Sequence, residues 1–154
     1  MFLWSLLAIV IIIFDQAVKF WVINSIGPSG SINVIPGILE FVYVKNTGAA
    51  FSFLSQKEYG IVLLSIISVV FCAVVIWYIL KKKPTSKLML VSLSCMVGGA
   101  AGNVLDRIFR GFVVDFIEVR FINFPVFNIA DIAITVGAFL IIIYEIFFDN
   151  AKKK

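Results

Sequence analysis

The sequence predicts an all-α membrane protein, a bundle of four transmembrane helices with a small β-sheet at its extracytoplasmic end. Hydrophobic residues make up 62% of the 154 residues and charged residues only 14%, whereas an ordinary soluble domain is roughly 45–50% apolar. A helix needs about 20 apolar residues to cross the bilayer core. Four segments meet that requirement within one integral membrane domain over residues 1–154, and they are residues 2–26, 59–80, 88–105 and 126–148.

Basic residues gather in two short clusters, one between the second and third predicted helices and one at the end of the sequence. Lysines in short loops near helix ends stay in the cytoplasm. The clusters, Lys81–Lys83 with Lys87 and Lys152–Lys154, therefore place that connection and the C-terminus in the cytoplasm, and four spans return the N-terminus there. This topology accounts for the net charge of +4, so no nucleic-acid partner is expected.

The connection over residues 30–56 is predicted to be extracytoplasmic and rich in β-structure. Residues Ile38–Val44 are mostly β-branched or aromatic, a composition that favours a strand. Residues 46–48 (Asn-Thr-Gly) follow as a turn, and Phe51–Leu54 are expected to form a short interfacial element. Within this loop, residues 42–51 are expected to be the mobile part.

A second short strand is predicted in the connection between the third and fourth helices. There, apolar Ile117 and Val119 alternate with charged Glu118 and Arg120, the period-two pattern of a strand with one buried face. Two such strands would form a small amphipathic sheet at the outer lipid surface, where Trp21 and other aromatic residues can anchor it.

The composition excludes several classes of catalytic and metal sites. The sequence contains no histidine, so histidine-bound metal sites and Ser-His or Cys-His nucleophile systems cannot form. Cys72 and Cys95 fall within the second and third predicted helices, where they are expected to be buried, apolar-like thiols. No metal or other cofactor is expected.

Aspartates from four different segments converge on the outer side of the predicted bundle, and they are Asp15, Asp106, Asp115 and Asp131. A charged aspartate inside a bilayer costs about 2.5–3.5 kcal/mol on insertion scales, and such residues mark functional sites by default. Apart from Glu145, every acid within or beside the apolar segments falls on this side. The convergence therefore predicts a functional site at the outer boundary of the membrane.

Amide and basic side chains accompany these acids at helical spacing. Lys19 follows Asp15 at i+4 and shares its helix face, either as a pair that neutralises its own buried charge or as part of a site. Asn103 and Arg107 share a face with Asp106, which is either a polar helix end or a group of functional side chains. Asp131 shares a face with Asn128, and a first-turn acid is also favoured there by the helix dipole alone.

Taken in order, these motifs resemble those of the bacterial lipoprotein signal peptidases, the type II signal peptidases, over essentially the whole chain. The matching stretches are Asp15 with Lys19, residues 46–51 (Asn-Thr-Gly-Ala-Ala-Phe), residues 102–107 (Gly-Asn-Val-Leu-Asp-Arg), residues 111–116 (Gly-Phe-Val-Val-Asp-Phe) and residues 127–131 (Phe-Asn-Ile-Ala-Asp). Each stretch alone is modest evidence, whereas their order and spacing together are specific.

The resemblance implies an aspartic endopeptidase of the cytoplasmic membrane. It would remove the signal peptide of a prolipoprotein immediately N-terminal to a cysteine that carries diacylglycerol, and it would act as a monomer in contact with membrane lipid. The resemblance makes Asp115 and Asp131 the catalytic pair. The residues that it assigns to shaping the site and holding the substrate are Asp15, Lys19, Asn46, Gly48, Asn103, Asp106, Arg107 and Asn128.

The chemistry of two carboxylates agrees with this assignment. Two carboxyl groups close together in a partly desolvated site do not both ionise easily, so one keeps a proton. The charged carboxylate can take a proton from an attacking water, and the protonated one can donate a hydrogen bond to the scissile carbonyl oxygen and later supply the proton for the leaving amine. Which aspartate keeps the proton is left open by the sequence.

Three other classes of protein remain as alternatives. A proton-coupled transporter would also use embedded acids, although transport sites usually lie near the bilayer midplane and repeated halves are common. A Ser-Lys protease would use Lys19 or Lys45 as its base, but no serine stands in a distinctive context beside either lysine. A structural membrane scaffold would leave the four aspartates unexplained.

Overall fold

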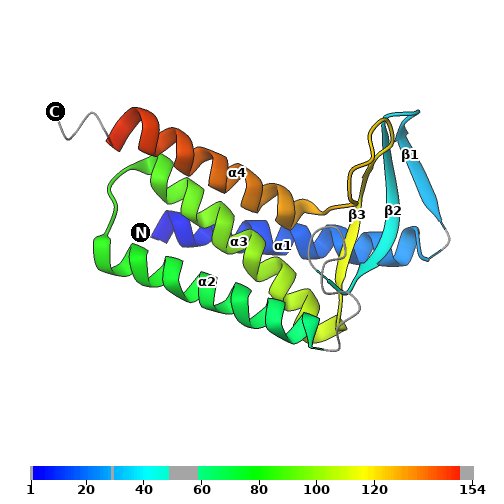
Figure 1. Cartoon of the computed structure of the whole chain (residues 1–154), viewed down its shortest axis with the longest axis horizontal. Coiled ribbons are helices and arrows are strands. Elements are labelled where there is room, and N and C mark those ends of the chain that lie inside the picture. Colours follow the sequence, from blue (N-terminus) through cyan, green and yellow to red (C-terminus); the bar gives the residue numbers. More distant parts are fainter. Residues whose placement is uncertain (1, 29, 49–58, 150–154) are drawn as a thin grey trace.

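The computed structural model describes residues 2–28, 30–48 and 59–149. The elements in chain order are α1 (Phe2–Ser25), β1 (Ser31–Ile35), β2 (Leu39–Asn46), α2 (Gly60–Lys82), α3 (Lys87–Arg110), β3 (Val113–Val119), α4 (Ile129–Tyr144) and a π-helical turn, η2 (Glu145–Asp149). The helices form a bundle, and the three-stranded sheet lies across one of its ends (Figure 1). The predicted interfacial element Phe51–Leu54, residues 49–51 of the loop and Lys152–Lys154 lie outside the described residues.

All four predicted membrane helices are confirmed, and each is long and apolar enough to cross a bilayer. The prediction was wrong about two helix ends. Helix α3 continues to Arg110 rather than ending at Leu105, because its last turns bury their polar side chains inside the molecule. The residue after its last turn is Gly111, whose φ of 75° is the left-handed conformation that terminates helices.

The fourth helix begins at Ile129 rather than at residue 126. Asn128 adopts an extended conformation, with φ −135° and ψ −179°, and its side chain accepts a hydrogen bond from the backbone N–H of Asp131. This is the geometry of an N-cap, which fixes where the helix starts. At its other end, the predicted α-helical residues 145–148 belong to the π-helical turn η2.

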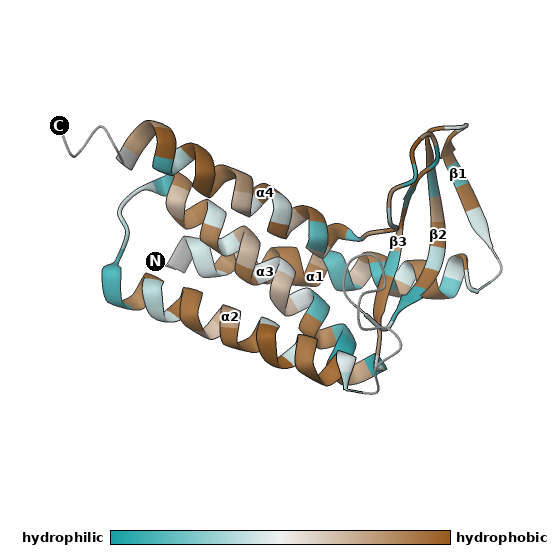
Figure 2. Cartoon of the chain, viewed as in Figure 1, coloured by the Kyte–Doolittle hydropathy of each residue, from teal (hydrophilic) through white to brown (hydrophobic). Residues whose placement is uncertain are grey.

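Helix α3 is the centre of the bundle and contacts each of the other three helices. In an apolar 18-residue stretch of α3, 61% of the residues are buried inside the protein. In the corresponding stretches of α1, α2 and α4, only 11–17% are buried. Those helices expose large apolar side chains such as Ile13, Val62 and Phe139, as expected for surfaces that face lipid. Figure 2 shows apolar residues along the helices and polar residues of α1, α3 and α4 where these helices approach the sheet.

Glycines on α3 allow its neighbours to approach closely. A Cβ atom at Gly99 would lie 2.3 Å from the carbonyl oxygen of Ala130 on α4, and one at Gly102 would lie 2.8 Å from the Asp15 Oδ2 on α1. At Gly99 the backbone of α4 leaves no room for a side chain, and at Gly102 the Asp15 carboxylate would have to shift. These two glycines therefore set the spacing of α1 and α4 around α3, next to the polar residues of the site.

The sheet is antiparallel with strand order β1-β2-β3. Both predicted strands are present, and β1 is a third strand that the sequence analysis did not predict. All five residues of β1 are exposed, although residues 31–34 (Ser-Ile-Asn-Val) alternate polar and apolar residues, a strand signal that the sequence analysis overlooked. Its pairing joins Ile32 to Phe41 in β2, and Phe41 is in turn paired with Ile117 in β3.

The inner face of the sheet packs on the last turns of α1. Val114 and Phe116 of β3 and Val22 of α1 form a buried apolar cluster. Phe41 packs edge-to-face against Phe116, with ring centroids 5.8 Å apart, and against Trp21 at 6.3 Å. This packing holds β3 firmly beside the end of the bundle where the aspartates gather.

Candidate functional site

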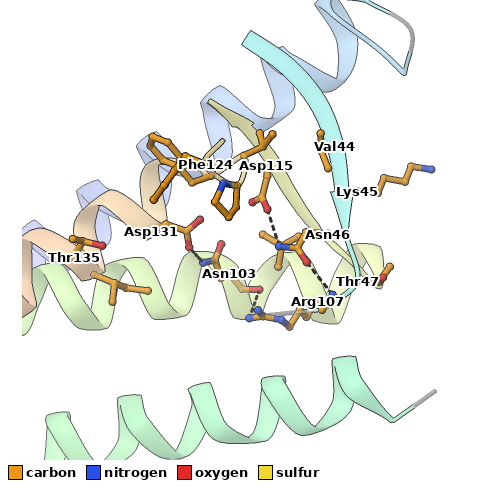
Figure 3. A pocket seen from close by; sticks show the side chains of 16 residues that line it. Val44, Lys45, Asn46, Thr47, Asn103, Arg107, Asp115, Phe124, Asp131 and Thr135 are labelled. Atoms are coloured by element: carbon orange, nitrogen blue, oxygen red, sulfur yellow. Dashed lines mark hydrogen bonds between the residues drawn. The ribbon is translucent and has the colours of Figure 1, made fainter. Parts of the chain in front are cut away.

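A cavity of about 480 Å³ opens between the sheet and the helix ends. Asp115 of β3 and Asp131 of α4 both line it, and so do Asn103 and Arg107 of α3 (Figure 3). The remaining lining residues include apolar side chains of the β3–α4 connection and α4, and they are Phe124, Pro125, Val126, Phe127 and Ile134. The cavity therefore has a polar floor and an apolar wall.

Asp115 is almost fully buried, with only 2% of its surface exposed. Its Oδ2 accepts a hydrogen bond of 2.8 Å from Asn46 Nδ2, and its Oδ1 accepts one of 2.6 Å from Asn128 Nδ2. Burial raises the pKa of Asp115 from 3.8 to about 6; the charge of Asp131 also raises the pKa, while the two amide donors and Lys19 lower it.

Asn46 reaches Asp115 because of the register of the two strands. Asn46 pairs with Val113, so Asp115 lies diagonally opposite on the same face of the sheet. The backbone N–H of Gly48 donates to Asn46 Oδ1 at 2.9 Å, which turns the amide NH₂ group toward Asp115. Both Asn46 and Gly48 line the cavity.

Asp131 is half-buried in the first turn of α4 and has two structural partners. Its Oδ2 accepts the backbone N–H of Asn128 at 3.2 Å, while Asn128 Oδ1 accepts the N–H of Asp131 at 3.0 Å. This reciprocal arrangement is a capping box. Its Oδ1 accepts Asn103 Nδ2 at 2.8 Å, so the carboxylate caps the helix and lines the cavity at the same time.

A chain of amides connects the two aspartates. Asn128 donates both to Asp115 Oδ1 and, at 3.2 Å, to Asn103 Oδ1. Asn103 in turn donates to Asp131. The carboxyl groups of Asp115 and Asp131 are thus held by one continuous hydrogen-bonded network in which asparagine amides are the donors.

Behind the cavity floor lies a fully buried ion cluster. The Lys19 ammonium is 2.8 Å from Asp15 Oδ2 and 2.9 Å from Asp106 Oδ2, and all three side chains have 0% exposure. Lys19 also donates to Asn103 Oδ1 at 3.0 Å. With three acceptors already bound, Lys19 is not free to act as a general base in a Ser-Lys mechanism.

The predicted site residues therefore fall into two groups around Asp115 and Asp131. Asn46, Gly48, Asn103 and Arg107 line the cavity. The other four are behind its lining and connect to it by hydrogen bonds, and they are Asp15, Lys19, Asp106 and Asn128. Lys45, the other alternative base, lines the cavity with its ammonium 5.0 Å from the centroid of the Phe112 ring.

The sequence analysis missed two members of the ion cluster, Gln16 and Arg110. Gln16 Nε2 donates to Asp106 Oδ1 at 3.1 Å, and Arg110 donates to the same Asp106 oxygen and to Gln16 Oε1 at 2.9 Å. The i+4 spacing of Asp106 and Arg110 was a usable signal. It was overlooked because the sequence analysis followed the helical spacing only as far as Arg107, and Gln16 carries no charge that would mark it.

Comparison with known proteins gives consistent matches over most of the chain. The sequence profile of the family described as Signal peptidase (SPase) II matches residues 7–147. The lipoprotein signal peptidase of Pasteurella multocida is 40% identical over 149 residues, which are 92% of this chain and 86% of that protein. The lipoprotein signal peptidase of Lactococcus lactis is 39% identical over 150 residues, 97% of each chain.

Two solved structures of bacterial membrane enzymes share the fold. One, determined by the in meso method at 2.3 Å resolution, superimposes with a TM-score of 0.89 at 34% identity and covers 100% of this chain and 93% of its own. The other, at 1.9 Å resolution, gives a TM-score of 0.85 at 34% identity, with 97% and 95% covered. The chain therefore belongs to the signal peptidase II family, the lipoprotein signal peptidases of bacterial membranes.

Proposed function

We propose that this lipoprotein signal peptidase is an aspartic endopeptidase with Asp115 and Asp131 as its catalytic pair. It would cleave the signal peptide from diacylglyceryl-modified prolipoproteins, immediately N-terminal to the lipid-modified cysteine. The observation that carries the proposal is the cavity at the end of the helix bundle, into which two carboxylates from separate elements face together. A linked pair of carboxyl groups can activate a water without a covalent intermediate.

The surroundings of the two aspartates support different roles for them. Asp115 is buried, and its pKa is raised to about 6, so it is the group that keeps the shared proton. Asp131 is less buried than Asp115, lies in the first turn of α4 and accepts a backbone N–H through its Oδ2. We assign Asp131 to take a proton from the attacking water, while Asp115 would donate a hydrogen bond to the scissile carbonyl oxygen and then give its one proton to the leaving amine.

The cavity lining suits a substrate that is partly apolar. Phe124, Phe127 and Ile134 offer apolar contacts for a signal peptide lying along the helices. Asn46 and Arg107, which line the same cavity, would hold polar groups of the peptide backbone close to the carboxyl pair. Such positioning of the scissile bond accounts for a large part of most enzymatic rate enhancements.

The distribution of lysines supports an active site on the extracytoplasmic side. Lys81–Lys83 and Lys87 lie at the connection of α2 and α3, at the opposite end of the bundle from the sheet (Figure 1). Because such clusters stay in the cytoplasm, the termini would be cytoplasmic and the sheet and cavity would face outward. The peptidase would act there as a monomer on substrates still anchored by their lipid.

Replacement of Asp115 or Asp131 by Asn, one at a time, tests the assignment. Each variant is expected to lose cleavage of a lipidated precursor by at least about 10³-fold, because neither half of the proton transfer can proceed without its carboxyl group. Cleavage is measured with purified enzyme, after comparable amounts of folded protein have been confirmed in the membrane.

The matched control is Glu118→Gln, which removes an acid from the same strand as Asp115 but outside the cavity, where Glu118 pairs with Arg120. This variant should cleave at the wild-type rate. Wild-type activity in either aspartate variant would contradict the proposal.

A further inference from the structure

Each proposed catalytic aspartate is preceded in the chain by a residue whose backbone N–H is bound to a buried carboxylate. The N–H of Ala130, next to Asp131, donates to Asp15 Oδ1 at 3.0 Å. The N–H of Val114, next to Asp115, donates to Asp106 Oδ2 at 3.0 Å. The two carboxylates that receive these bonds come from α1 and α3, so each anchor ties a catalytic segment to a different helix.

A single ammonium group links the two anchors. Lys19 Nζ lies within 2.9 Å of the nearer carboxylate oxygens of both Asp15 and Asp106. The anchors are therefore held at a fixed separation by one cation between two anions. Asp15 and Asp106 would repel each other without it, since like charges in a buried site are strongly unfavourable.

Gln16 and Arg110 complete this cluster on its partly exposed side. Arg110 donates to Asp106 Oδ1 and to Gln16 Oε1, and Gln16 Nε2 donates to Asp106 Oδ1 at 3.1 Å and to Asp15 Oδ2 at 3.2 Å. The negative charges of Asp15 and Asp106 are thus balanced by the positive charges of Lys19 and Arg110. Such buried ionic groups seldom add net stability compared with an apolar core, so their arrangement calls for another explanation.

We propose that Gln16 and Arg110 are positioning residues, which with Asp15, Lys19 and Asp106 set the separation and orientation of the Asp115 and Asp131 carboxyl groups through the two backbone anchors. The proposal rests on the catalytic roles given above. A backbone bond one residue away fixes the direction in which each aspartate side chain leaves the main chain. Since a displacement of about 1 Å can cost about 10²-fold in rate, loosening the cluster should slow catalysis without removing any reacting group.

Two substitutions loosen the cluster while leaving its buried core in place. Arg110→Met removes a charge whose side chain is 24% exposed, and Gln16→Met removes the bridging amide with no change of charge. Arg110→Lys is the conservative variant that restores a cation. Arg120→Met is the matched control, because Arg120 pairs with Glu40 and Glu118 on the sheet and does not contact the cluster.

The first measurement is kcat and KM for a lipidated precursor as a function of pH. Arg110→Met and Gln16→Met are expected to lower kcat about 10- to 100-fold with little change in KM, and Arg110→Lys should recover most of the loss. Carboxyl groups held further apart repel each other less, so the two apparent pKa values of the pair should lie closer together. The acidic and alkaline limbs of the pH profile should therefore move toward each other. Other charges facing the pair are Lys19 on α1, Arg107 on α3 and Lys45 on β2, and all of them are unchanged.

The second measurement is amide hydrogen exchange in residues 113–116 and 129–132, which reports the anchors without reference to catalysis. Faster exchange in both segments, together with lower kcat and converging limbs, supports the proposal. Wild-type kcat in folded Arg110→Met and Gln16→Met overturns it. So does a loss of kcat in which exchange is unchanged and both limbs shift in the same direction, because that result shows an effect of charge alone.

Failure of the proposed function gives a different result. Activity in the Asp115→Asn or Asp131→Asn variant would contradict the assignment of these two residues as the catalytic pair. The exchange experiment would still report whether the anchors are intact. Inactive aspartate variants combined with fully active Arg110→Met and Gln16→Met would instead overturn only the positioning role.

Discussion

At the scale of single residues, Asp115 and Asp131 are bound by the same kind of group, an asparagine amide, in different surroundings. Asp115 lies on strand β3 of the sheet and has 2% of its surface exposed. Asp131 lies at a helix N-terminus and accepts a backbone N–H as well. The two carboxyl groups thus differ in burial and in their partners, and different environments are how enzymes give two like groups separate acid and base roles.

The raised pKa of Asp115 predicts how the Asp115→Asn substitution changes the pH dependence of the free energy of unfolding. Because folding raises its pKa from 3.8 to about 6, Asp115 stabilises the folded state at low pH relative to neutral pH, and this contribution is lost as the pH rises through 6. Between pH 5 and pH 8 the loss is roughly 1 kcal/mol for this shift. The melting temperature of Asp115→Asn, relative to the wild type, should therefore be higher at pH 8 than at pH 5.

This comparison is made by thermal unfolding in the same detergent at both pH values. Glu118→Gln serves as the control, since Glu118 is more exposed and lies outside the cavity; its difference from the wild type should be the same at both pH values. An Asp115→Asn difference that does not change with pH would contradict the burial argument.

At the scale of elements, the contact between α3 and α4 determines where Asp131 lies. Gly99 packs directly on the backbone at Ala130, the residue before Asp131. The sequence analysis located the helices well because the length of each apolar segment matches the thickness of the bilayer core. It misplaced the end of α3 because Asp106 and Arg110 are charged yet lie within the helix, where their charges are balanced by partners from α1 that a one-dimensional pattern does not reveal.

Gly99→Ala should be more harmful than Gly98→Ala, although both add one methyl group. At Gly99 the new Cβ would lie 2.3 Å from a backbone oxygen on α4, whereas at Gly98 its nearest contacts are at 3.0 Å on α1. We expect Gly99→Ala to cost about 1–3 kcal/mol in the free energy of unfolding and to lower kcat, because the shift moves Asp131. Denaturant titration and kcat of the two variants measure this; equal effects would show that α4 adjusts freely.

The same reasoning explains which parts of the site the sequence revealed. The acids and amides were found because polar side chains in apolar segments are conspicuous. Strand β1 was overlooked because its alternating sequence is only five residues long and is flanked by Gly30 and Pro36. Gln16 was missed because it is neutral. The anchors on Ala130 and Val114 use backbone N–H groups, which are present at every non-proline residue and so leave no signal in the sequence.

At the scale of the whole molecule, the polar residues are concentrated at one end. A transport site would be expected near the middle of the membrane, whereas the cavity here lies where the helices meet the sheet. The large apolar surfaces of α1, α2 and α4 face outward along the bundle. This arrangement suits a reaction at the membrane boundary, between a peptide in the lipid and water outside.

The orientation of the molecule can be tested by labelling with a membrane-impermeant maleimide. Ser31→Cys places a thiol on the exposed strand β1, and Thr85→Cys places one in the exposed α2–α3 connection. In intact cells the first should be labelled, and the second only after permeabilisation, because the lysines around Thr85 predict that this connection is cytoplasmic. The parent protein controls for Cys72 and Cys95, and the reverse labelling pattern would invert the proposed topology.

The capping box has a practical consequence for inhibitor design. One oxygen of Asp131 is committed to starting α4, and the same carboxylate lines the cavity. A compound that donates a hydrogen bond to Asp131 would therefore contact a side chain that the bacterium cannot exchange without also disturbing the start of a membrane helix. Resistance by substitution at this position would carry two penalties at once, one in peptide cleavage and one in the assembly of the protein.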